Sequence, residues 1–394
     1  MIGIHPDTAA LPGAYIFRET GARIAAFEAA HPHLTVCRLG IGDVAYPPGR
    51  TVVRALRRAA REMGHSATFR GYPPDGGYPF LRNALSLAYT RVGVTLPPDA
   101  FFIGDGAKSD GADLLSVTDA RDIVMPTPAY PVYGDSAVMY GRRLIPVRAC
   151  AENGFLPAPP REQYPGALVI LISPNNPCGV AYPRALLADW LAYTRACGGL
   201  LLFDNSYAAF ARPGAVRSIY ELDGARSLAV EVGSFSKWAA FTGLRCSYLV
   251  LPPELQCGGR LLRAAWARRQ AARFNGVSYV IQRAAEAALS PAGYREAARS
   301  LRIYRENTAI LRETLAACRV PFVGGEDSPY LFAACPAGLS SRAFFERLLT
   351  QCGVAVTPGV GFGADGEGYV RFSALATRAC VRQACLRLRL FFAQ

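Results

Sequence analysis

Three short apolar segments, each followed directly by polar residues, constrain the fold of this chain more than any other feature. The apolar segments span residues 168–172, 200–203 and 228–232, and the polar segments that follow them span 173–179, 204–207 and 234–237. Apolar runs of four or five residues are typical of strands that are buried in a parallel sheet. Because ligands of open α/β sheets bind at the carboxyl ends of strands, we expect the three polar segments to surround one ligand.

The alternation of short apolar runs with helix-like stretches extends from about residue 80 to residue 275. It predicts an α/β protein with a doubly wound, mostly parallel sheet. Apolar spacing predicts further helices over residues 16–30, 50–62, 280–289, 294–318 and 341–351, with several short strands between the last two. We expect a large domain over residues 43–277 and a small α+β domain formed by residues 1–42 and 278–394.

The composition of the 394-residue chain indicates a compact globular protein. Hydrophobic residues make up 51% and charged residues 19% of the sequence, which is not the composition of a disordered chain. No apolar run approaches the length of a membrane span and no apolar leader is visible, so we expect a cytoplasmic protein without a membrane partner. Eleven cysteines and four histidines lack metal-site spacing. The net charge of +13 comes mostly from dispersed arginines, which argues against nucleic-acid binding.

Lys237 follows the third apolar segment, in the sequence Glu231-Val-Gly-Ser-Phe-Ser-Lys-Trp238. Two hydroxyl residues, Ser234 and Ser236, precede it, and Arg245 follows eight residues later. A lysine amine forms a Schiff base with an aldehyde, while hydroxyls and a guanidinium bind a phosphate dianion. This combination predicts pyridoxal 5′-phosphate as a cofactor. Because Ser-x-Ser-Lys also occurs by chance, the prediction depends on the other two polar segments.

Those segments supply the other groups that the cofactor needs. Asp204 is suited to face the pyridine nitrogen and keep it protonated, so that the ring can accept electrons from a carbanion. Asn176 and Tyr207 are suited to hydrogen-bond the 3-oxygen of the ring, and Tyr130 is suited to stack on its face. Taken singly, these residues are also explained as turn residues or a helix cap. Their occurrence in this order favours the cofactor site, in which a freed Lys237 amine would move the proton.

A further phosphate-binding element is predicted at Asp105-Gly-Ala-Lys108, between the apolar run 101–104 and a helical segment. Gly106 and Ala107 would present free backbone N–H groups at the helix N-terminus. Lys108 is either a surface charge of this helix or a residue of the site, and its position favours the site.

Six phrases of the sequence resemble the LL-diaminopimelate aminotransferase family, within the aspartate-aminotransferase superfamily of pyridoxal-phosphate enzymes. They are Gly40-Ile-Gly-Asp43, Thr68-Phe-Arg-Gly-Tyr72, Asp105-Gly-Ala-Lys108, Tyr130-Pro-Val-Tyr133, Phe274-Asn-Gly-Val-Ser278 and Gly359-Val-Gly-Phe-Gly363. The resemblance extends from about residue 15 to residue 373. It implies the fold type I of pyridoxal-phosphate transferases, with a mostly parallel seven-stranded sheet in the large domain, and a homodimer in which two chains complete each site.

The resemblance also implies roles for residues of the substrate pocket. Arg371, in Tyr369-Val-Arg-Phe-Ser373, is expected to bind the α-carboxylate, for which a bidentate guanidinium is suited. Tyr72 is expected to reach the cofactor phosphate of the other chain. The other residues expected to contact substrate are Tyr15, Gly42, Lys108, Tyr130, Asn176 and Asn275, the last from across the interface.

The chain departs from the family pattern at three positions. Cys178 replaces a threonine in Asn176-Pro-Cys-Gly179, and Trp238 replaces a threonine or proline after the lysine. Tyr46 stands where many relatives have an acidic or amide residue that contacts the distal ammonium of the substrate. Because a phenol accepts a hydrogen bond but carries no charge, Tyr46 as a substrate contact predicts weak discrimination for a second amino-acid group.

The favoured function is an aminotransferase that moves an amino group between a polar amino acid and 2-oxoglutarate, with LL-diaminopimelate as the leading donor. Such an enzyme would supply lysine and peptidoglycan precursors. Tyr46 and Trp238 keep open a second function, in which the same cofactor serves elimination, replacement, cyclisation or oxidation of an arginine- or methionine-derived amino acid. A third, a binding or regulatory protein without turnover, is disfavoured by the complete set of site residues.

Overall fold

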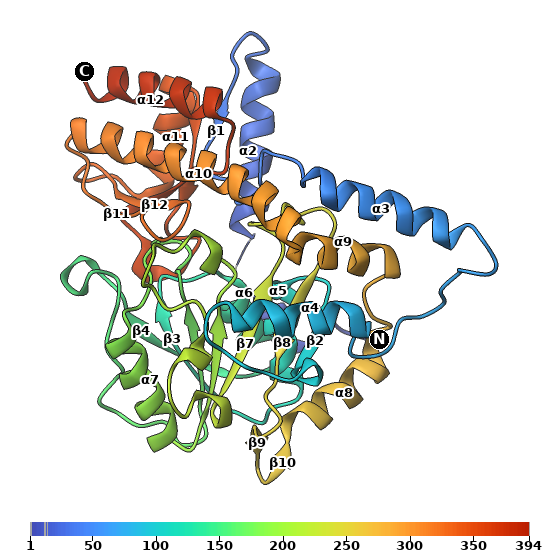
Figure 1. The fold of residues 1–394 in the computed structure, drawn as a ribbon. Helices are drawn as coiled ribbons and strands as arrows, with labels where there is room; N and C mark the ends of the chain where they lie inside the picture. Colours follow the sequence, from blue (N-terminus) through green and yellow to red (C-terminus); the bar gives the residue numbers. More distant parts are fainter. Residues whose placement is uncertain (1, 12, 14, 394) are drawn as a thin grey trace.

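A computed structural model describes residues 2–11, 13 and 15–393 of the chain. Within these residues the main sheet has seven strands in the order β2-β8-β7-β6-β5-β3-β4 (Figure 1). All are parallel except β8, which runs antiparallel to both of its neighbours. The prediction of a mostly parallel α/β sheet is confirmed. The strands are β2 (Phe101–Gly104), β3 (Asp122–Thr127), β4 (Arg143–Arg148), β5 (Leu168–Ile172), β6 (Leu200–Asp204), β7 (Ala229–Ser234) and β8 (Ser247–Val250).

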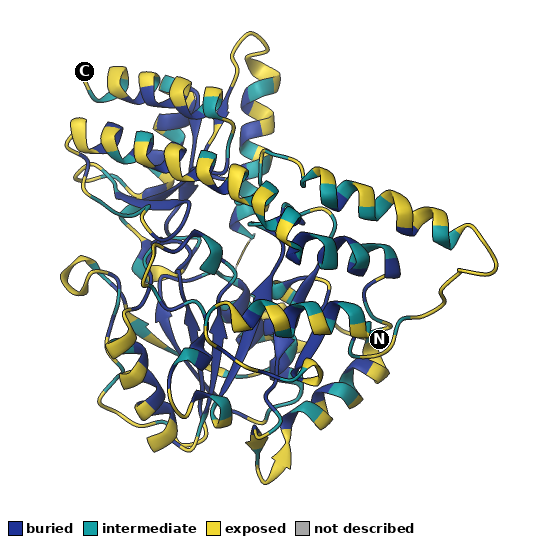
Figure 2. Cartoon of the chain, viewed as in Figure 1, coloured by how far each residue is buried: buried dark blue, intermediate teal, exposed yellow. Residues whose placement is uncertain are grey.

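Helices cover both faces of the main sheet, because its central strands bury side chains on both sides. Along β5, Val169 and Leu171 join one apolar core, and Leu168, Ile170 and Ile172 join the other. The first core also contains residues of α4 (Pro79–Thr90), α7 (Arg184–Ala196) and α9 (Tyr279–Leu289). The second contains residues of α5 (Ala107–Asp113), α6 (Val132–Met139) and α8 (Leu262–Arg273). The strands form a buried layer in Figure 2.

A smaller α+β unit lies beside the main sheet and has its own apolar core. Its antiparallel sheet has the order β11-β12-β15-β14, and β1 pairs with β13. The strands are β1 (Cys37–Arg38), β11 (Phe322–Gly324), β12 (Tyr330–Ala334), β13 (Val354–Ala355), β14 (Thr357–Pro358) and β15 (Tyr369–Ser373). The helices are α2 (Ile16–Ala30), α10 (Pro291–Ala317), α11 (Ser341–Cys352) and α12 (Arg378–Phe392). The chain also contains α1 (Pro6–Ala9), α3 (Arg50–Met63) and a hairpin of β9 (Gln256–Cys257) and β10 (Arg260–Leu261).

The five helices predicted from apolar spacing are confirmed as α2, α3, α9, α10 and α11, with bounds that agree within a few residues. Helix α9 packs against α3 and α4, and its alanines join the core of the main sheet. The following helix α10 contributes Leu311 and Leu315 to the core of the smaller unit. The domain boundary between residues 277 and 278 stays a prediction; the packing of α9 favours a boundary within α10. Among the described helices, none is long and apolar enough to cross a membrane.

Candidate active site

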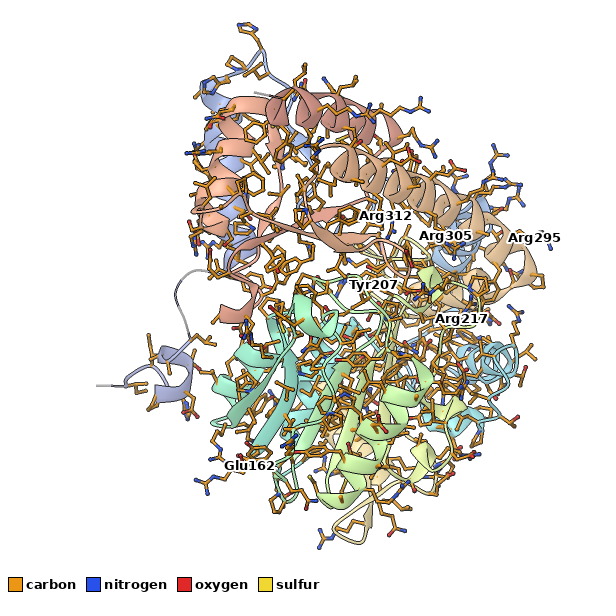
Figure 3. All side chains as sticks on the ribbon, turned by 90° about the vertical axis from the view of Figure 1, so that its left-hand side faces the viewer. Glu162, Tyr207, Arg217, Arg295, Arg305 and Arg312 are labelled. Carbon is orange, nitrogen blue, oxygen red and sulfur yellow. The ribbon has the colours of Figure 1, made fainter. Side chains whose placement is uncertain are left out.

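A cavity of about 520 Å³ lies where the carboxyl ends of β5, β6 and β7 meet the smaller unit. Tyr207, labelled in Figure 3, lies at this junction. Most of the residues predicted from the sequence line the cavity: Tyr15, Gly42, Ala107, Lys108, Tyr130, Asn176, Asp204, Tyr207, Ser234, Ser236, Lys237, Arg245 and Arg371. The fold therefore brings together residues that are separated by up to 356 positions in the sequence, from Tyr15 to Arg371.

Lys237 lies just beyond the end of β7, and its amine points to the loop before α3. Its Nζ donates a hydrogen bond to the carbonyl of Gly42 at 2.6 Å. The pKa of Lys237 is lowered to about 8, mainly by burial; the Asp43 carboxylate acts to raise it, and the guanidinium groups of Arg371 and Arg245 act to lower it. About a tenth of the amine is therefore neutral at pH 7, and the neutral amine is the form that attacks an aldehyde.

Asp204 ends β6 with its carboxylate held by two donors. Tyr133 donates its hydroxyl to Oδ2 at 2.6 Å, and the backbone N–H of Ser206 donates to Oδ1 at 3.0 Å. Burial raises the pKa of Asp204, and the hydrogen bonds from Ser206 and Tyr133 oppose this rise. Because both donors stabilise the ionised form, the site presents a fixed carboxylate suited to a cationic ring nitrogen.

The segment that carries Asp204 is fixed from behind by a buried carboxylate, Glu231 of β7. Asn205 donates from Nδ2 to Glu231 Oε1 at 2.7 Å and to the carbonyl of Arg217 at 3.1 Å. The other oxygen of Glu231 accepts from Ser218 Oγ and from the N–H of Ile219, both at 2.8 Å. Burial raises the pKa of Glu231 to about 7. This network joins the ends of β6 and β7, which bear the two central residues of the site.

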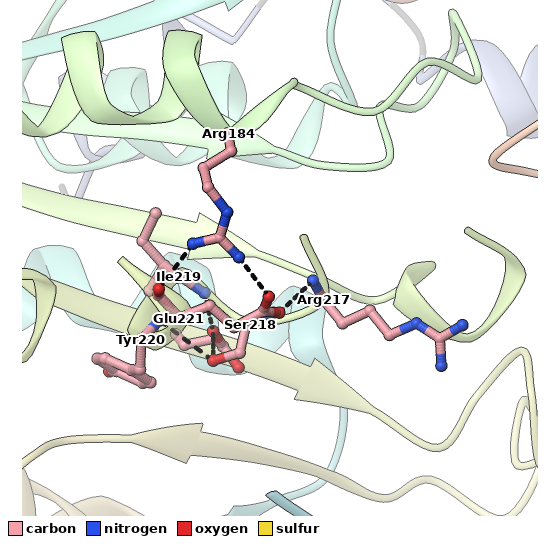
Figure 4. Close-up of polar contacts among 7 residues, drawn as sticks. Arg184, Arg217, Ser218, Ile219, Tyr220 and Glu221 are labelled. Carbon is pink, nitrogen blue, oxygen red and sulfur yellow. Dashed lines mark hydrogen bonds and ion pairs between the residues drawn. The ribbon is translucent and has the colours of Figure 1, made fainter. Parts of the chain in front are cut away.

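The turn over residues 217–221 is itself tied down by Glu221 (Figure 4). The Glu221 carboxylate accepts from the backbone N–H groups of Arg217 and Ser218, at 2.7 and 3.0 Å. Arg184 of α7 donates to the same carboxylate at 2.9 Å and to the Glu221 carbonyl at 2.7 Å. The turn behind the site is thus anchored to a helix that packs on the main sheet.

The residues predicted to bind phosphate lie together at the start of α5. Arg245 has a left-handed backbone with φ 63°, a conformation that costs a non-glycine residue about 1–3 kcal/mol. Its guanidinium lies so close to Gly106 that a Cβ at this glycine would overlap it. Ser234 and Ser236 line the same side of the cavity, and the N–H of Ser236 donates to Ser234 Oγ at 3.1 Å. Gly106 does not line the cavity itself, but it leaves room for the Arg245 side chain.

Arg371, on β15, is buried, with 1% of its surface exposed. Its Nη1 donates to Asn176 Oδ1 and its Nη2 to the carbonyl of Gly40, both at 2.6 Å. The guanidinium carbon lies 4.3 Å from the ring centre of Tyr330 and 4.9 Å from that of Phe362. In the described part of the chain no carboxylate pairs with Arg371, and its Nε has no hydrogen-bond partner. A buried cation of this kind is suited to an anionic ligand.

Tyr15, Lys108 and Tyr130 form the wall of the cavity next to α5 and α6. Lys108 donates from Nζ to the Tyr15 hydroxyl at 3.2 Å, and the same nitrogen lies 4.6 Å from the centre of the Tyr15 ring. Burial raises the pKa of Tyr130, so this phenol stays protonated. The chain has two lysines in all, Lys108 and Lys237, and both line the cavity.

Two predicted residues lie away from the cavity, on the surface of the chain. The Tyr72 side chain is 83% exposed, on the loop between α3 and α4, and Asn275 is exposed just after α8. Both were expected to act on the site of a partner chain, and these roles stay predictions.

Tyr46 also lies outside the lining of this cavity, although it was expected to contact substrate. Its ring packs 5.6 Å from that of Tyr304, and its backbone N–H donates to the Tyr304 hydroxyl at 3.1 Å. The Tyr46 hydroxyl accepts from the backbone N–H of Arg378 at 3.3 Å. Tyr46 instead borders a neighbouring cavity of about 40 Å³, which Lys237 also lines. Its contact with substrate stays a prediction, and these contacts account for the phenol by packing.

The other two departures from the family pattern have packing partners as well. The Trp238 ring stacks on Tyr294 with centres 5.3 Å apart and planes at 13°. Cys178 is buried beside Phe155 and Phe332. Both residues therefore fit the packing around the site.

Sequence reasoning missed Tyr330 and did not assign a role to Tyr133, whose hydroxyl contacts Asp204. The hydroxyls of Tyr330 and Tyr207 lie 2.8 Å apart, and Tyr330 lines the cavity. Tyr330 begins an antiparallel strand of the smaller unit and lies in none of the phrases that predicted the site. Its only signal in the sequence is the preceding Ser-Pro turn.

Comparisons with known proteins agree with this geometry. The model of the class I and II aminotransferase family matches residues 35–388. The chain belongs to this family. It is 39% identical to an LL-diaminopimelate aminotransferase of Agathobacter rectalis, over 99% of the chain and 100% of that protein, and 40% identical to one of Bacteroides fragilis, over 96% and 97%.

Solved structures give the same family. The L,L-diaminopimelate aminotransferase of Chlamydomonas reinhardtii superposes with a TM-score of 0.92 at 31% identity, over 99% of both chains. The fold is thus fold type I, as the resemblance implied, and the chain is a pyridoxal-phosphate-dependent aminotransferase. The cavity fits this cofactor, because an amine of lowered pKa, a buried carboxylate, two serine hydroxyls and the Arg245 guanidinium line it together.

Proposed function

We propose that this aminotransferase transfers an amino group from LL-diaminopimelate to 2-oxoglutarate, within the synthesis of lysine and peptidoglycan precursors. The choice of substrate rests on the sequence identity of 39–40% with LL-diaminopimelate aminotransferases, over nearly the whole chain. The cavity supports it with one buried guanidinium for a carboxylate and with polar groups for a second one.

Lys237 is the proposed point of covalent attachment, as a Schiff base, and the proposed proton carrier. When bound, the cofactor supplies an electron sink for the carbanion formed at the substrate Cα. The Lys237 amine, with its pKa of about 8, accepts a proton in its neutral form and returns it as the ammonium. The Gly42 carbonyl, 2.6 Å from Nζ, holds the amine at the cavity wall between these transfers.

The remaining residues orient and polarise the reactants. Asp204 would present its carboxylate to the ring nitrogen of the bound cofactor, and Ser234, Ser236 and Arg245 would hold its phosphate. Asn176 already binds Arg371 at 2.6 Å, so a substrate carboxylate at Arg371 also lies beside this amide. Bidentate binding of the carboxylate at Arg371 would orient the Cα–H bond relative to Lys237.

We also propose a homodimer with shared sites. The loop over residues 64–75 is mostly exposed and carries Phe69 and Tyr72, which are 59% and 83% exposed. Large exposed aromatic side chains on one loop are suited to a protein interface. Cross-linking in solution, with the variant Tyr72→Phe as a test of cofactor affinity, would examine this assembly.

A donor panel tests the proposed reaction. LL-diaminopimelate, lysine, arginine and methionine, each labelled with ¹⁵N at the α-amino group, are incubated with 2-oxoglutarate and the loaded enzyme. We expect label in glutamate, fastest from diaminopimelate. Free labelled ammonia would instead indicate elimination, and label transferred only from another donor would exclude diaminopimelate.

A further inference from the structure

Tyr330 lies where the Tyr207 phenol, the Arg371 guanidinium and the loop that holds Lys237 come together. It begins β12 of the smaller unit and is buried, with 1% of its surface exposed. Its hydroxyl lies 2.8 Å from that of Tyr207, and its ring lies 4.3 Å from the Arg371 guanidinium carbon. One side chain therefore touches both a residue expected to face the cofactor and the residue expected to bind substrate.

The hydrogen bond between the Tyr207 and Tyr330 hydroxyls can form in two ways, depending on which hydroxyl donates. Each phenol has one proton, and in the part of the chain that is described the only hydrogen bond of either hydroxyl joins Tyr207 to Tyr330. If Tyr207 donated to Tyr330, it would offer a ligand only lone pairs. If Tyr330 donates to Tyr207, the Tyr207 proton remains free for an acceptor in the cavity. Besides Tyr330, the titratable groups that face the Tyr207 hydroxyl are Arg371 and Tyr130. The positive charge of Arg371 disfavours a cationic ligand at this hydroxyl but does not disfavour an anionic ligand oxygen.

Tyr330 also restricts the backbone that holds the lysine. A Cβ at Gly42 would lie 2.8 Å from the Tyr330 hydroxyl oxygen, which is closer than real side chains approach. The next atoms that it would meet, Lys237 Nζ at 3.8 Å and Tyr330 Cζ at 3.9 Å, are at ordinary contact distance. Of these three atoms, the Tyr330 oxygen alone lies too close for a Cβ at the position whose carbonyl accepts from Lys237.

We infer that Tyr330 is a positioning residue of the aminotransferase site: it donates to Tyr207, so that the Tyr207 proton points into the cavity, and it packs against Gly42. A Tyr207 proton directed in this way selects a ligand with an anionic oxygen beside the aldehyde. The inference rests on the proposed attachment of the cofactor at Lys237 and is independent of the amino donor.

The variant Tyr330→Phe tests the proton arrangement, because it removes one oxygen and keeps the ring against Arg371. The measurement is the pH midpoint of the visible absorbance of the cofactor-loaded protein. Without the hydrogen bond from Tyr330, Tyr207 donates more weakly to the cofactor oxygen. That oxygen then keeps more negative charge, which favours protonation of the neighbouring nitrogen. We expect the midpoint to rise by about half a unit to one unit.

Two controls separate this role from a structural one. Tyr304→Phe removes a hydroxyl from the same aromatic cluster, where it accepts from Tyr46, and should leave the midpoint unchanged. In a Tyr207→Phe background, Tyr330→Phe should cause no further shift, because the effect passes through Tyr207. The inference would be overturned by a further shift in the Tyr207→Phe background, or by equal shifts in Tyr330→Phe and Tyr304→Phe. Loss of folding in Tyr330→Phe would overturn it as well.

The packing against Gly42 has an independent test that does not depend on the reaction. Gly42→Ala should weaken cofactor affinity about tenfold or more in the presence of Tyr330 and less than about threefold when combined with Tyr330→Phe. Equal losses in both backgrounds would refute the steric link. If the enzyme is inactive with diaminopimelate but Tyr330→Phe shows the absorbance shift, the proposed donor is wrong and the role of Tyr330 stands.

Discussion

Removal of the Tyr133 hydroxyl should raise, by a measurable amount, the pH below which the enzyme loses affinity for its cofactor. Tyr133→Phe keeps the ring in the core beneath the site but deletes the donor that lies 2.6 Å from Asp204 Oδ2. The N–H of Ser206, at 3.0 Å from Oδ1, then remains as a donor to this carboxylate. Because burial already raises the pKa of Asp204, the loss of a donor moves it further upward.

The size of the shift follows from the strength of one charge-assisted hydrogen bond. Such a bond contributes about 1.5–3 kcal/mol to the ionised form. With about 1.4 kcal/mol for each pKa unit, the pKa of Asp204 should rise by about one to two units. The ionised carboxylate is the form that pairs with a cationic ring nitrogen, so cofactor affinity should begin to fall at a pH about one to two units higher than in the parent enzyme.

Equilibrium dialysis of pyridoxal 5′-phosphate between pH 4 and pH 9 would measure this change without reference to turnover. The matched control is Tyr220→Phe, which removes a buried hydroxyl that donates to the Ala229 and Val250 carbonyls, away from Asp204. If the acid limb coincided in Tyr133→Phe and the parent enzyme while both bound cofactor at pH 8, Tyr133 would not set the charge of Asp204.

Further predictions concern Lys237, Arg371 and Tyr46. Lys237→Ala should lower turnover by about a thousandfold or more while the protein still binds cofactor. In the parent enzyme, borohydride should fix the cofactor on the peptide that contains Lys237, and mass mapping to another peptide would count against this role. Reductive labelling of Lys237 by a small aldehyde should rise through about pH 8, with Lys108→Arg as the control; a midpoint near 10 would contradict the role of burial. Arg371→Lys should raise KM for amino acids about tenfold to a hundredfold with cofactor affinity unchanged, since a bidentate pair is lost; loss of cofactor would instead place Arg371 at the phosphate. Tyr46→Phe should leave the donor preference unchanged and lower the free energy of unfolding in urea by about 0.5–1.5 kcal/mol, because the lost hydroxyl accepts from the backbone N–H of Arg378; an altered donor preference would place Tyr46 at the substrate.

The sequence predicted the central part of the fold well, for a definite physical reason. Strands buried on both faces need unbroken apolar runs, so β5, β6 and β7 are visible without any tertiary information. The polar residues at their ends must lie at one edge of the sheet, which brings Asn176, Asp204 and Lys237 together. The helices α2 and α3 were visible because one face of each is apolar.

The parts that could not be predicted depend on contacts between distant segments. Tyr330 is 123 positions from Tyr207, and its short antiparallel strand has the composition of an ordinary core strand. Helix α9 has an alanine-rich face that would fit either unit, and only its packing against α3 and α4 decides between them. Tyr46 was interpreted from a local phrase, whereas the packing of its ring is set by Tyr304, 258 positions away.

The restriction of lysine to the cavity has a consequence for chemical selectivity. Aldehydes condense with any accessible primary amine, and a typical basic surface would offer them many competing sites. Here the basic charge is carried by arginine, whose guanidinium does not form a stable imine, and the two lysine side chains both face one cavity. Among side chains, amine-directed reagents should therefore act on this protein almost as affinity labels, because both lysines that they can modify line the cavity.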